Sequence, residues 1–391
     1  MTPLALALLG LPAALASAYL LLLTLYSRAP VLPPPAPRRQ RFSVLVPAHD
    51  EAAVIERTLA SLAQLDWPRQ RLHVLVLADN CSDATAAKAR AAGAEVLERR
   101  DPLNRGKGRA LEYGLRVLAQ RKWADAIVVV DADSQVSRNL LDAFAARLEL
   151  GAQVVQARYE VLNPNATWRT RLMSLALACF HVLRSRARER LGLSCGIRGN
   201  GWCVTRRLLR ELPYRCFSLA EDLEYGIALG LEGRRVYYAD DARVCGEMAA
   251  REPAARAQCR RWEDGRFGLI RTRSLPLLRT ALRRRDALCL DLALDLLVLP
   301  LSYIAVLLAA FTAAAAVAAQ AQPALSGWLW LALACDASLA LYVLRGWQLS
   351  GLGAQGLLDL ARAPFYVAWK LLAMLTPHQS TEWIRTRREP L

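Results

Sequence analysis

The segment AIVVVDAD, residues 126–133, joins a short run of strand-forming residues to two carboxylates. Its first five residues are apolar and mostly β-branched, which favours a buried strand because the run is too short for an ordinary helix. Asp131 and Asp133 follow where that strand would end. A buried strand that ends in polar residues is typical of a sheet with a binding site at its edge.

Two similar runs precede this segment, at residues 42–46 and 72–77. Stretches with helical periodicity separate the three runs and cover residues 51–65, 84–92 and 109–120. Alternating strands and helices predict an α/β fold, with a parallel sheet covered by helices on both faces. Ligands in such sheets bind beyond the carboxyl ends of the strands, so we expect functional side chains directly after Val46, Leu77 and Val130.

The two ends of the 391-residue chain are more apolar than its middle. Residues 1–27 contain no charged side chain and are long enough to cross a hydrocarbon layer of roughly 30 Å. A cleaved signal peptide is the alternative, since Ala16-Ser17-Ala18 resembles a cleavage site. Because the start lacks a positive region and the apolar run continues past that site, we interpret residues 1–27 as a retained transmembrane helix.

The remaining segments follow from the order of apolar and basic runs. We expect a basic, Pro-rich linker (28–41), a cytosolic α/β domain (42–275), a basic or amphipathic connector (276–295), two transmembrane helices (296–319 and 325–344), an interfacial or transmembrane helix (351–375) and a cytosolic tail (376–391). Arg38, Arg39 and Arg41 place the domain in the cytosol by the positive-inside tendency. For the same reason we favour an interfacial helix at 351–375, which keeps the arginines of the tail on the cytosolic side.

The net charge of +16 limits the choice of partners. The basic residues cluster beside the apolar segments, which fits the cytoplasmic flanks of membrane helices better than a nucleic-acid groove. We therefore expect contact with membrane lipids and no nucleic acid. The nine cysteines form no C-x-x-C pair and the four histidines have no metal-ligand spacing, a pattern typical of reduced thiols.

Polar residues follow the first two predicted strands. Glu51 ends the segment PAHDE (47–51), and Asp79 begins the segment DNCSD (79–83). Carboxylates at strand ends accept hydrogen bonds from a base or a ribose, so both residues are candidates for a nucleoside pocket. Turn or helix-cap roles for these acids are the alternative.

Two further segments carry groups suited to phosphate chemistry. Lys107 lies between two glycines just before a predicted helix, where backbone N–H groups and a cation could meet a phosphate, although a plain flexible loop has the same composition. Asp131 and Asp133 could share Mg²⁺ or Mn²⁺ together with substrate phosphates. The competing interpretation of the two aspartates is a solvated turn.

Two helices complete the candidate site. Asp222, in the segment AEDLE (220–224), could act as a general base, although acids also favour the first turn of any helix. Gln258, Arg261 and Trp262 share one helix face and could hold a sugar or a phosphate. A tryptophan that anchors the helix at a bilayer surface is the alternative.

Taken in order, these segments resemble the family 2 glycosyltransferases, in the membrane branch of the cellulose, chitin and hyaluronan synthases and bacterial exopolysaccharide enzymes. The resembling segments are PAHDE, DNCSD, GKG, DAD, AEDLE and QCRRW. The resemblance covers about residues 40–270 and implies a GT-A fold with inverting transfer. Two residues depart from the usual pattern: Ala78 replaces an acid and Ala220 replaces a threonine.

The resemblance also implies a role for each candidate. Glu51, Asp79, Lys107, Asp131 and Asp133 would bind the nucleotide-sugar, with the divalent metal at Asp133 and Asp131. Asp222 would be the base, and Gln258, Arg261 and Trp262 would hold the acceptor and the diphosphate. Trp202, in the segment GNGW (199–202), would line the acceptor path. Trp383, Thr386 and Arg388, in the tail, are similar to a gating loop.

The sequence thus predicts a glycosyltransferase in the bacterial inner (plasma) membrane, with its catalytic domain in the cytoplasm. A UDP-sugar is the expected donor, and a glycan or a lipid-linked glycan the expected acceptor. Three membrane-spanning helices are too few to enclose a sugar-sized pore, so assembly with partner subunits or into an oligomer stays an open alternative. The alternatives are a basic membrane scaffold and a non-catalytic relative that only binds nucleotide-sugars.

Overall fold

The computed structural model describes residues 3–375, and its centre is a single sheet of eight strands. The strands lie in the order β3-β2-β1-β4-β7-β6-β8-β5. Their bounds are β1 (Phe42–Ala48), β2 (Leu72–Asp79), β3 (Glu95–Arg99), β4 (Ala126–Val129), β5 (Ser134–Val136), β6 (Val154–Val161), β7 (Trp202–Thr205) and β8 (Val236–Gly246). The three strands expected at 42–46, 72–77 and 126–130 are therefore present as β1, β2 and β4.

The sheet has a parallel half and a mixed half. Strands β3, β2, β1 and β4 are all parallel, as expected. Strand β7 is antiparallel to both β4 and β6, and β5 is antiparallel to β8. The prediction of a parallel sheet, made from the strands within residues 42–130, is confirmed for those strands, and the mixed half lies beyond the segments from which it was made. The strands of the mixed half include two of only 3 and 4 residues, β5 and β7, which are too short for periodicity to reveal their direction.

Helices cover both faces of the sheet. Those packed around it are α2 (Ile55–Ala63), α3 (Thr85–Ala91), α4 (Lys107–Arg121), α5 (Leu140–Glu149), α8 (Arg206–Glu211) and α9 (Glu221–Leu231), with a short 3-10 turn η1 (Arg69–Arg71). One apolar core joins residues such as Leu59 and Phe144 to one face, and a second joins Leu115 and Leu229 to the other. Burial on both faces explains why the parallel strands are continuously apolar.

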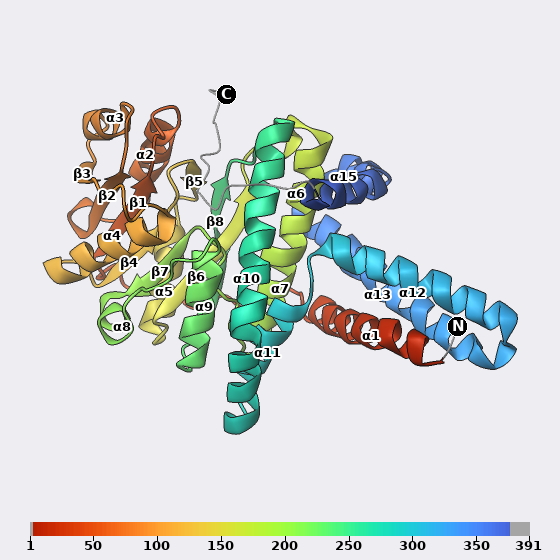
Figure 1. The fold of residues 1–391 in the computed structure, drawn as a ribbon. Coiled ribbons are helices and arrows are strands. Elements are labelled where there is room, and N and C mark those ends of the chain that lie inside the picture. The colour runs from red at the N-terminus through yellow and green to blue at the C-terminus, as the bar shows by residue number, and fades with distance from the viewer. Residues whose placement is uncertain (1–2, 376–391) are drawn as a thin grey trace.

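Two long helical columns stand beside the mixed half of the sheet (Figure 1). The first is α6 (Trp168–Leu177), which follows the turn η2 (Pro164–Ala166) and continues through the π-helical segment η3 (Ala178–Leu183) into α7 (Arg184–Arg190). The second is α10 (Glu252–Arg284), which packs against α11 (Ala287–Leu297).

Residues 276–295, expected to be a basic or amphipathic connector, fall within two packed helices. Helix α10 continues through residue 275 and Pro276, and α11 follows it. Leu277 and Ala281 are buried with Cys289 and Leu292 of α11, and this pair of helices closes the side of the domain. The many basic residues of this segment favoured the interpretation as a connector, although its apolar positions are regularly spaced.

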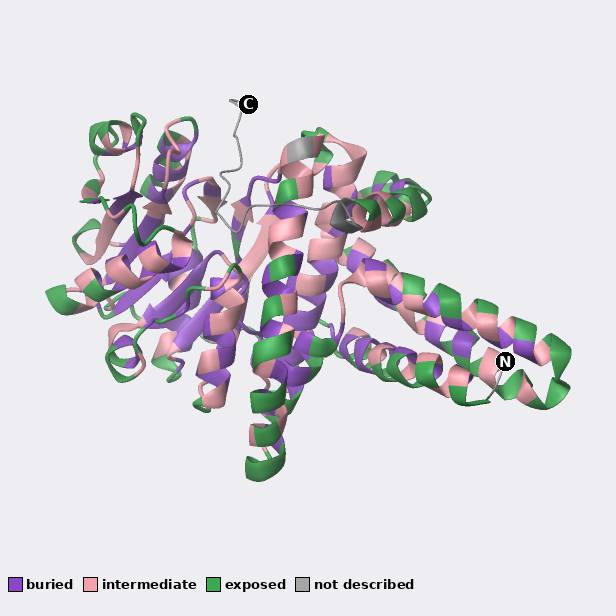
Figure 2. Cartoon of the chain, in the orientation of Figure 1, coloured by how far each residue is buried: buried purple, intermediate pink, exposed green. Residues whose placement is uncertain are grey.

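Within residues 3–375, three helices are long and apolar enough to cross a membrane. They are α1 (Pro3–Leu25), α12 (Leu301–Ala321) and the stretch Pro323–Ser350, which consists of the turn η4 (Pro323–Leu325) and α13 (Ser326–Ser350). They pack side by side and project from the domain (Figure 1). Leucines such as Leu4, Leu8 and Leu331 are exposed on the outer faces of this bundle, as an apolar surrounding requires (Figure 2).

The segment expected at 351–375 forms two short helices, α14 (Gly353–Leu360) and α15 (Ala363–Leu375). Neither is among the membrane-spanning candidates, since 13 residues of helix extend only about 20 Å. Helix α15 lies against α10, where Lys370 pairs with Glu263 and the Trp369 indole donates to Glu252 over 2.9 Å. The interfacial alternative for this segment thus fits the helix lengths better than a fourth span.

Candidate active site

A cavity of about 960 Å³ opens at the carboxyl edge of the parallel strands and extends toward the apolar bundle. Residues that follow β1, β2 and β4 line one end, together with the first turns of α4 and α9. Side chains of α6, η3, α13 and α15 line the other end. The candidates that line it are Glu51, Asp79, Lys107, Asp131, Asp133, Asp222, Gln258, Arg261 and Trp262.

Lys107 lies at the centre of the acidic end. Its Nζ is 2.7 Å from Oδ1 of Asp131 and 3.8 Å from Oε1 of Glu221, and it donates to the carbonyl oxygen of Gly199 over 3.2 Å. Burial lowers the pKa of Lys107, but the carboxylates of Asp131 and Glu221 outweigh it and raise the pKa above its ordinary value. The lysine is therefore a fixed positive charge, and it is already within reach of carboxylates.

Carboxylates outnumber the lysine around this point. Burial raises the pKa of Asp131, and the neighbouring Asp133 and Asp222 raise it further against the effect of Lys107. Burial likewise raises the pKa of Glu221 to about 7, with Asp222 adding to the shift. This surplus of negative charge is a suitable setting for a hard cation, whose ligands in proteins are carboxylate oxygens.

Asp222 approaches the segment that precedes β7. Its Oδ2 lies so close to Gly199 that a Cβ at that position would be 3.1 Å away, and Gly199 has φ +87°. Only glycine adopts such a backbone conformation at little cost. The absence of a side chain at Gly199 also leaves room for the Asp222 carboxylate in the cavity. Asn200 holds the same segment to the end of β4, since its Oδ1 accepts from the Asp131 backbone N–H over 3.0 Å.

The nucleoside candidates lie at the opposite rim. Asp79 is buried, and its Oδ1 pairs with Arg99 of β3 over 2.5 Å. Arg99 also donates to the carbonyl oxygen of Asn104, which ties the loop before Lys107 to the sheet. The backbone N–H of Glu51 donates to Thr85 over 2.8 Å. Asp79 is thus ion-paired within the protein as well as facing the cavity.

Helix α10 supplies the third wall through Gln258, Arg261 and Trp262. Gln258 is buried and its Oε1 accepts from the Ala249 backbone N–H over 3.4 Å. Among residues 3–375, Arg261 forms no hydrogen bond or ion pair. A cavity-lining guanidinium without a carboxylate partner is available to an anion.

Trp202 does not line the cavity, which corrects the expectation that it borders the acceptor path. It is 1% exposed, stacks on Tyr214 and packs against Tyr225 in the core under the sheet. Successive residues of a strand point to opposite faces, and β7 turns this side chain inward. The gating-loop candidates Trp383, Thr386 and Arg388 lie outside the described residues.

Several site residues were not predicted as such from the sequence: Arg99, Arg198, Gly199, Asn200 and Glu221. Glu221 was passed over because its neighbour Asp222 has the same chemistry. Gly199 and Asn200 carry a usable signal, since a glycine-asparagine-glycine segment just before a strand indicates unusual backbone geometry.

In the described part of the chain, one other group of residues could hold a metal ion: Asp50, Cys81 and Asp83 have ligand atoms within 4.8 Å of one another. These side chains already organise the turn after β2, since Asp50 accepts from the Ser82 and Asp83 backbone N–H groups and Asp83 from that of Thr85. Burial raises the pKa of the Cys81 thiol, which keeps the poorer ligand protonated. None of the three lines the cavity.

The family described as "glycosyltransferase like family 2" matches residues 37–265, more than half of the chain. The chain belongs to this family. Family 2 relatives include glucomannan 4-beta-mannosyltransferase 7 of Arabidopsis thaliana, which is 25% identical over 61% of this chain and 44% of its own length. "Probable glycosyltransferase YdaM" of Bacillus subtilis (strain 168) is 30% identical over 48% of this chain and 46% of its own length. The chain thus spans about half the length of these relatives.

Among solved structures, the family 2 chain is similar to a mannosyltransferase, PcManGT, from Pyrobaculum calidifontis, in complex with GDP-Man and Mn²⁺. The TM-score is 0.51 at 20% identity, and the match covers 84% of this chain and 97% of that one. This likeness confirms the expected GT-A-like α/β fold. The matched span includes every candidate up to Trp262.

Proposed function

We propose that this chain is a membrane-bound inverting glycosyltransferase that transfers a sugar from a nucleotide-sugar to a glycan or lipid-linked acceptor. The observation that carries the proposal is the convergence of Asp79, Asp131, Asp133 and Asp222 on one cavity together with Lys107. These five residues come from four separate segments of a family 2 domain. A basic membrane scaffold has no need to bring them together.

In this mechanism Asp222 removes the proton from the acceptor hydroxyl, which then attacks the anomeric carbon opposite the leaving diphosphate. Lys107 and Arg261 stabilise the negative charge that develops on the diphosphate. Asp79 and Glu51 fix the nucleoside at the rim. Inversion of an α-linked donor yields a β-linked product.

The residues also fit a divalent cation. Asp131 and Asp133 provide hard oxygen ligands at a point where carboxylates exceed ammonium groups. Mg²⁺ or Mn²⁺ held there would neutralise the departing diphosphate.

The three apolar helices support placement in a membrane, and the basic flanks support a cytoplasmic domain in the bacterial inner membrane. The relatives support GDP-mannose as a donor beside the UDP-sugar that the sequence predicts. The plant relatives are named as glucomannan mannosyltransferases, and the solved mannosyltransferase holds GDP-Man. A UDP-sugar is our first choice, and GDP-mannose belongs in the same panel.

The test is release of nucleoside diphosphate by the purified full chain, with a panel of UDP- and GDP-sugars and a membrane lipid extract as the acceptor source. We expect one donor to be consumed, and Asp222→Asn to lower turnover at least 100-fold while donor affinity changes little. Near-normal turnover in that variant would remove Asp222 from its role.

The metal assignment has its own test. Asp133→Ala should abolish the heat signal of Mn²⁺-dependent donor binding in titration calorimetry, whereas Asp83→Ala, which changes the acidic group outside the cavity, should keep it. An unchanged trace for Asp133→Ala would contradict the assignment. Failure of every donor in the panel would instead favour a relative without catalytic activity.

A further inference from the structure

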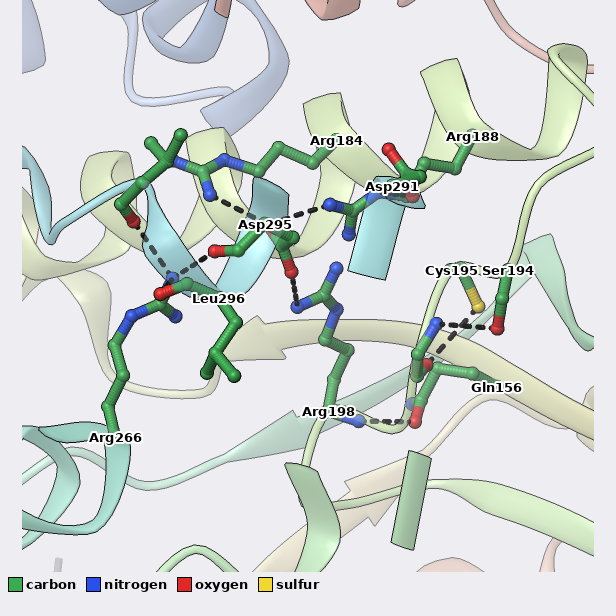
Figure 3. Close-up of polar contacts among 12 residues, drawn as sticks. Gln156, Arg184, Arg188, Ser194, Cys195, Arg198, Arg266, Asp291, Asp295 and Leu296 are labelled. Atoms are coloured by element: carbon green, nitrogen blue, oxygen red, sulfur yellow. Dashed lines mark hydrogen bonds and ion pairs between the residues drawn. The ribbon is translucent and has the colours of Figure 1, made fainter. Parts of the chain in front are cut away.

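A cluster of buried arginines surrounds Asp295 of α11 (Figure 3), and three of them, Arg184, Arg198 and Arg266, line the cavity. Arg184, Arg188, Arg198 and Arg266 are at most 8% exposed, and they meet Asp295 of α11 at its side chain or its carbonyl group. Asp291 adds one more carboxylate, 2.9 Å from Arg188. Four guanidinium groups therefore face two carboxylates, and the cluster keeps a positive surplus.

Three of the four arginines have clear structural partners. Arg184 donates to Asp295 and to the Tyr342 hydroxyl, both over 2.8 Å. Arg188 joins Asp291 and Asp295. Arg266 donates to the carbonyl oxygens at the C-terminal end of α11, including that of Val298 over 2.9 Å. These contacts fasten α7 and α10 to α11.

Arg198 has the fewest polar contacts of the four, although Arg188 Nη1 and Arg266 Nε also have no hydrogen-bond partner among residues 3–375. Its Nη1 is 3.4 Å from Asp295, a long contact, and its Nε and Nη2 have no hydrogen-bond partner among residues 3–375 although the side chain is 3% exposed. Burial lowers the pKa of Arg198, and Arg188 lowers it further against the effect of Asp295. A buried donor without an acceptor is costly, which points to a ligand that is absent here.

Arg198 lies between the reaction centre and an apolar wall. The next residue, Gly199, touches Asp222 and accepts from Lys107. The Arg198 guanidinium lies over the Phe180 ring, 4.3 Å from its centroid, and Phe180 sits in the π-helical segment η3. Single π-helical turns often occur at functional sites. Beyond Phe180 the cavity is lined mostly by apolar side chains of the neighbouring helices: Leu172, Met173, Ala176, Leu301, Leu339 and Val343.

We propose that Arg198 binds a phosphoryl group of an acceptor whose apolar chain lies along α6, α12 and α13. This assignment rests on the proposed glycosyl transfer and names the acceptor class, a glycan linked through phosphate to an isoprenoid-type lipid, whose sugar hydroxyl is the group that Asp222 deprotonates. Guanidinium groups hold phosphate oxygens by two parallel hydrogen bonds, which satisfies the free Nε and Nη2 of Arg198. An apolar chain suits a wall that adjoins the membrane bundle.

Arg198→Gln is expected to fold, since it removes one like charge from a cluster with surplus arginines. The experiment is titration calorimetry on the detergent-solubilised full chain without donor, using citronellyl phosphate, citronellol and inorganic phosphate as probes. In the unmodified protein we expect citronellyl phosphate to bind at least tenfold more tightly than either partial probe. Arg198→Gln should lose roughly tenfold or more for citronellyl phosphate and little for citronellol, and Arg198→Lys should lie between.

The matched control is Arg207→Gln, which removes an arginine whose side chain is 82% exposed on α8 and should change nothing. Equal affinity of Arg198→Gln and the unmodified protein for citronellyl phosphate would overturn the proposal. So would inorganic phosphate binding as tightly as citronellyl phosphate, because the apolar wall would then have no part. A parallel loss of nucleoside diphosphate affinity would assign Arg198 to the donor and also overturn it.

If Arg198→Gln does not fold, the comparison of the three probes on the unmodified protein, together with Arg198→Lys, decides the question. These measurements need no donor. A failure of lipid phosphate binding with normal donor turnover rejects this inference alone. An absence of donor turnover with intact lipid phosphate binding rejects the proposed function and leaves Arg198 in a binding site for a lipid phosphate that is not an acceptor.

Discussion

At the scale of single residues, the cavity is divided by charge. Asp131, Glu221 and Asp222 crowd around Lys107 at the sheet edge, whereas Arg198 keeps two side-chain nitrogens without a partner on the side of the cavity that Arg184 and Arg266 line. The acidic end could be predicted because each acid follows a recognisable strand or begins a helix. The basic end could not, since Arg198 stands among many other arginines and only the tertiary fold buries it.

The crowding of charges around Lys107 should make the free energy of unfolding depend on pH through Glu221. Its pKa is raised to about 7 from the ordinary 4.5, so the folded protein holds this proton more tightly than the unfolded chain. The free energy of unfolding should therefore fall as the pH rises from about 4.5 to about 7, by at most about 3 kcal/mol. In Glu221→Gln that loss is absent.

The measurement is the thermal unfolding midpoint in detergent at pH 5 and pH 8. We expect Glu221→Gln to be more stable than the unmodified protein at pH 8 and to show a smaller difference between the two pH values. Glu232→Gln, at the exposed C-terminal end of α9, serves as the control and should retain the original pH dependence. An identical pH dependence in Glu221→Gln would show that this carboxyl is not strained by its neighbours.

At the scale of elements, local pattern succeeded where an element carries its own periodicity. Strands β1, β2 and β4 and the apolar helices α1, α12 and α13 were found near their true bounds. Strand β7 was missed because 4 residues carry too little periodicity. The role of α11 could not be predicted, because the arginines that pair with Asp291 and Asp295 come from α7, far earlier in the chain.

One contact between elements is unusually tight. A Cβ on Gly346 of α13 would lie 2.0 Å from the Cys179 Sγ atom of η3, whereas a Cβ on Gly327 of the same helix would meet nothing within 4 Å. Gly346→Ala should therefore force α13 away from η3 and destabilise the protein by about 1–3 kcal/mol, despite the better helix propensity of alanine.

Gly327→Ala makes the same chemical change without the clash and should be neutral or slightly stabilising. Thermal unfolding midpoints of both variants in detergent measure the difference. Because η3 also carries Phe180, we expect Gly346→Ala to weaken citronellyl phosphate binding as well. Equal midpoints for the two variants would mean that Cys179 moves aside freely.

At the scale of the whole molecule, the bundle of α1, α12 and α13 projects from the domain that holds the sheet (Figure 1), and residues of α12 and α13 line the same cavity as the sheet edge. The sequence predicted both parts and their order along the chain. It could not predict that the cavity would continue from the sheet edge to α13, because that depends on how α6 and α10 are placed between them. Long-range arrangement of this kind leaves no periodic trace in a single sequence.

Because α12 and α13 line part of the cavity, the acceptor concentration that matters for this protein is its concentration within the lipid, not its concentration in the bulk solution. A substrate dissolved in a bilayer is confined to two dimensions, and its supply depends on how densely it populates the lipid sheet, not on how much is present per litre. Diluting a fixed amount of lipid acceptor with inert detergent should therefore slow turnover, whereas diluting acceptor and detergent together should leave it nearly constant. Initial rates measured over both dilution series test this, and a rate that follows only the bulk acceptor concentration would mean that the acceptor arrives from water.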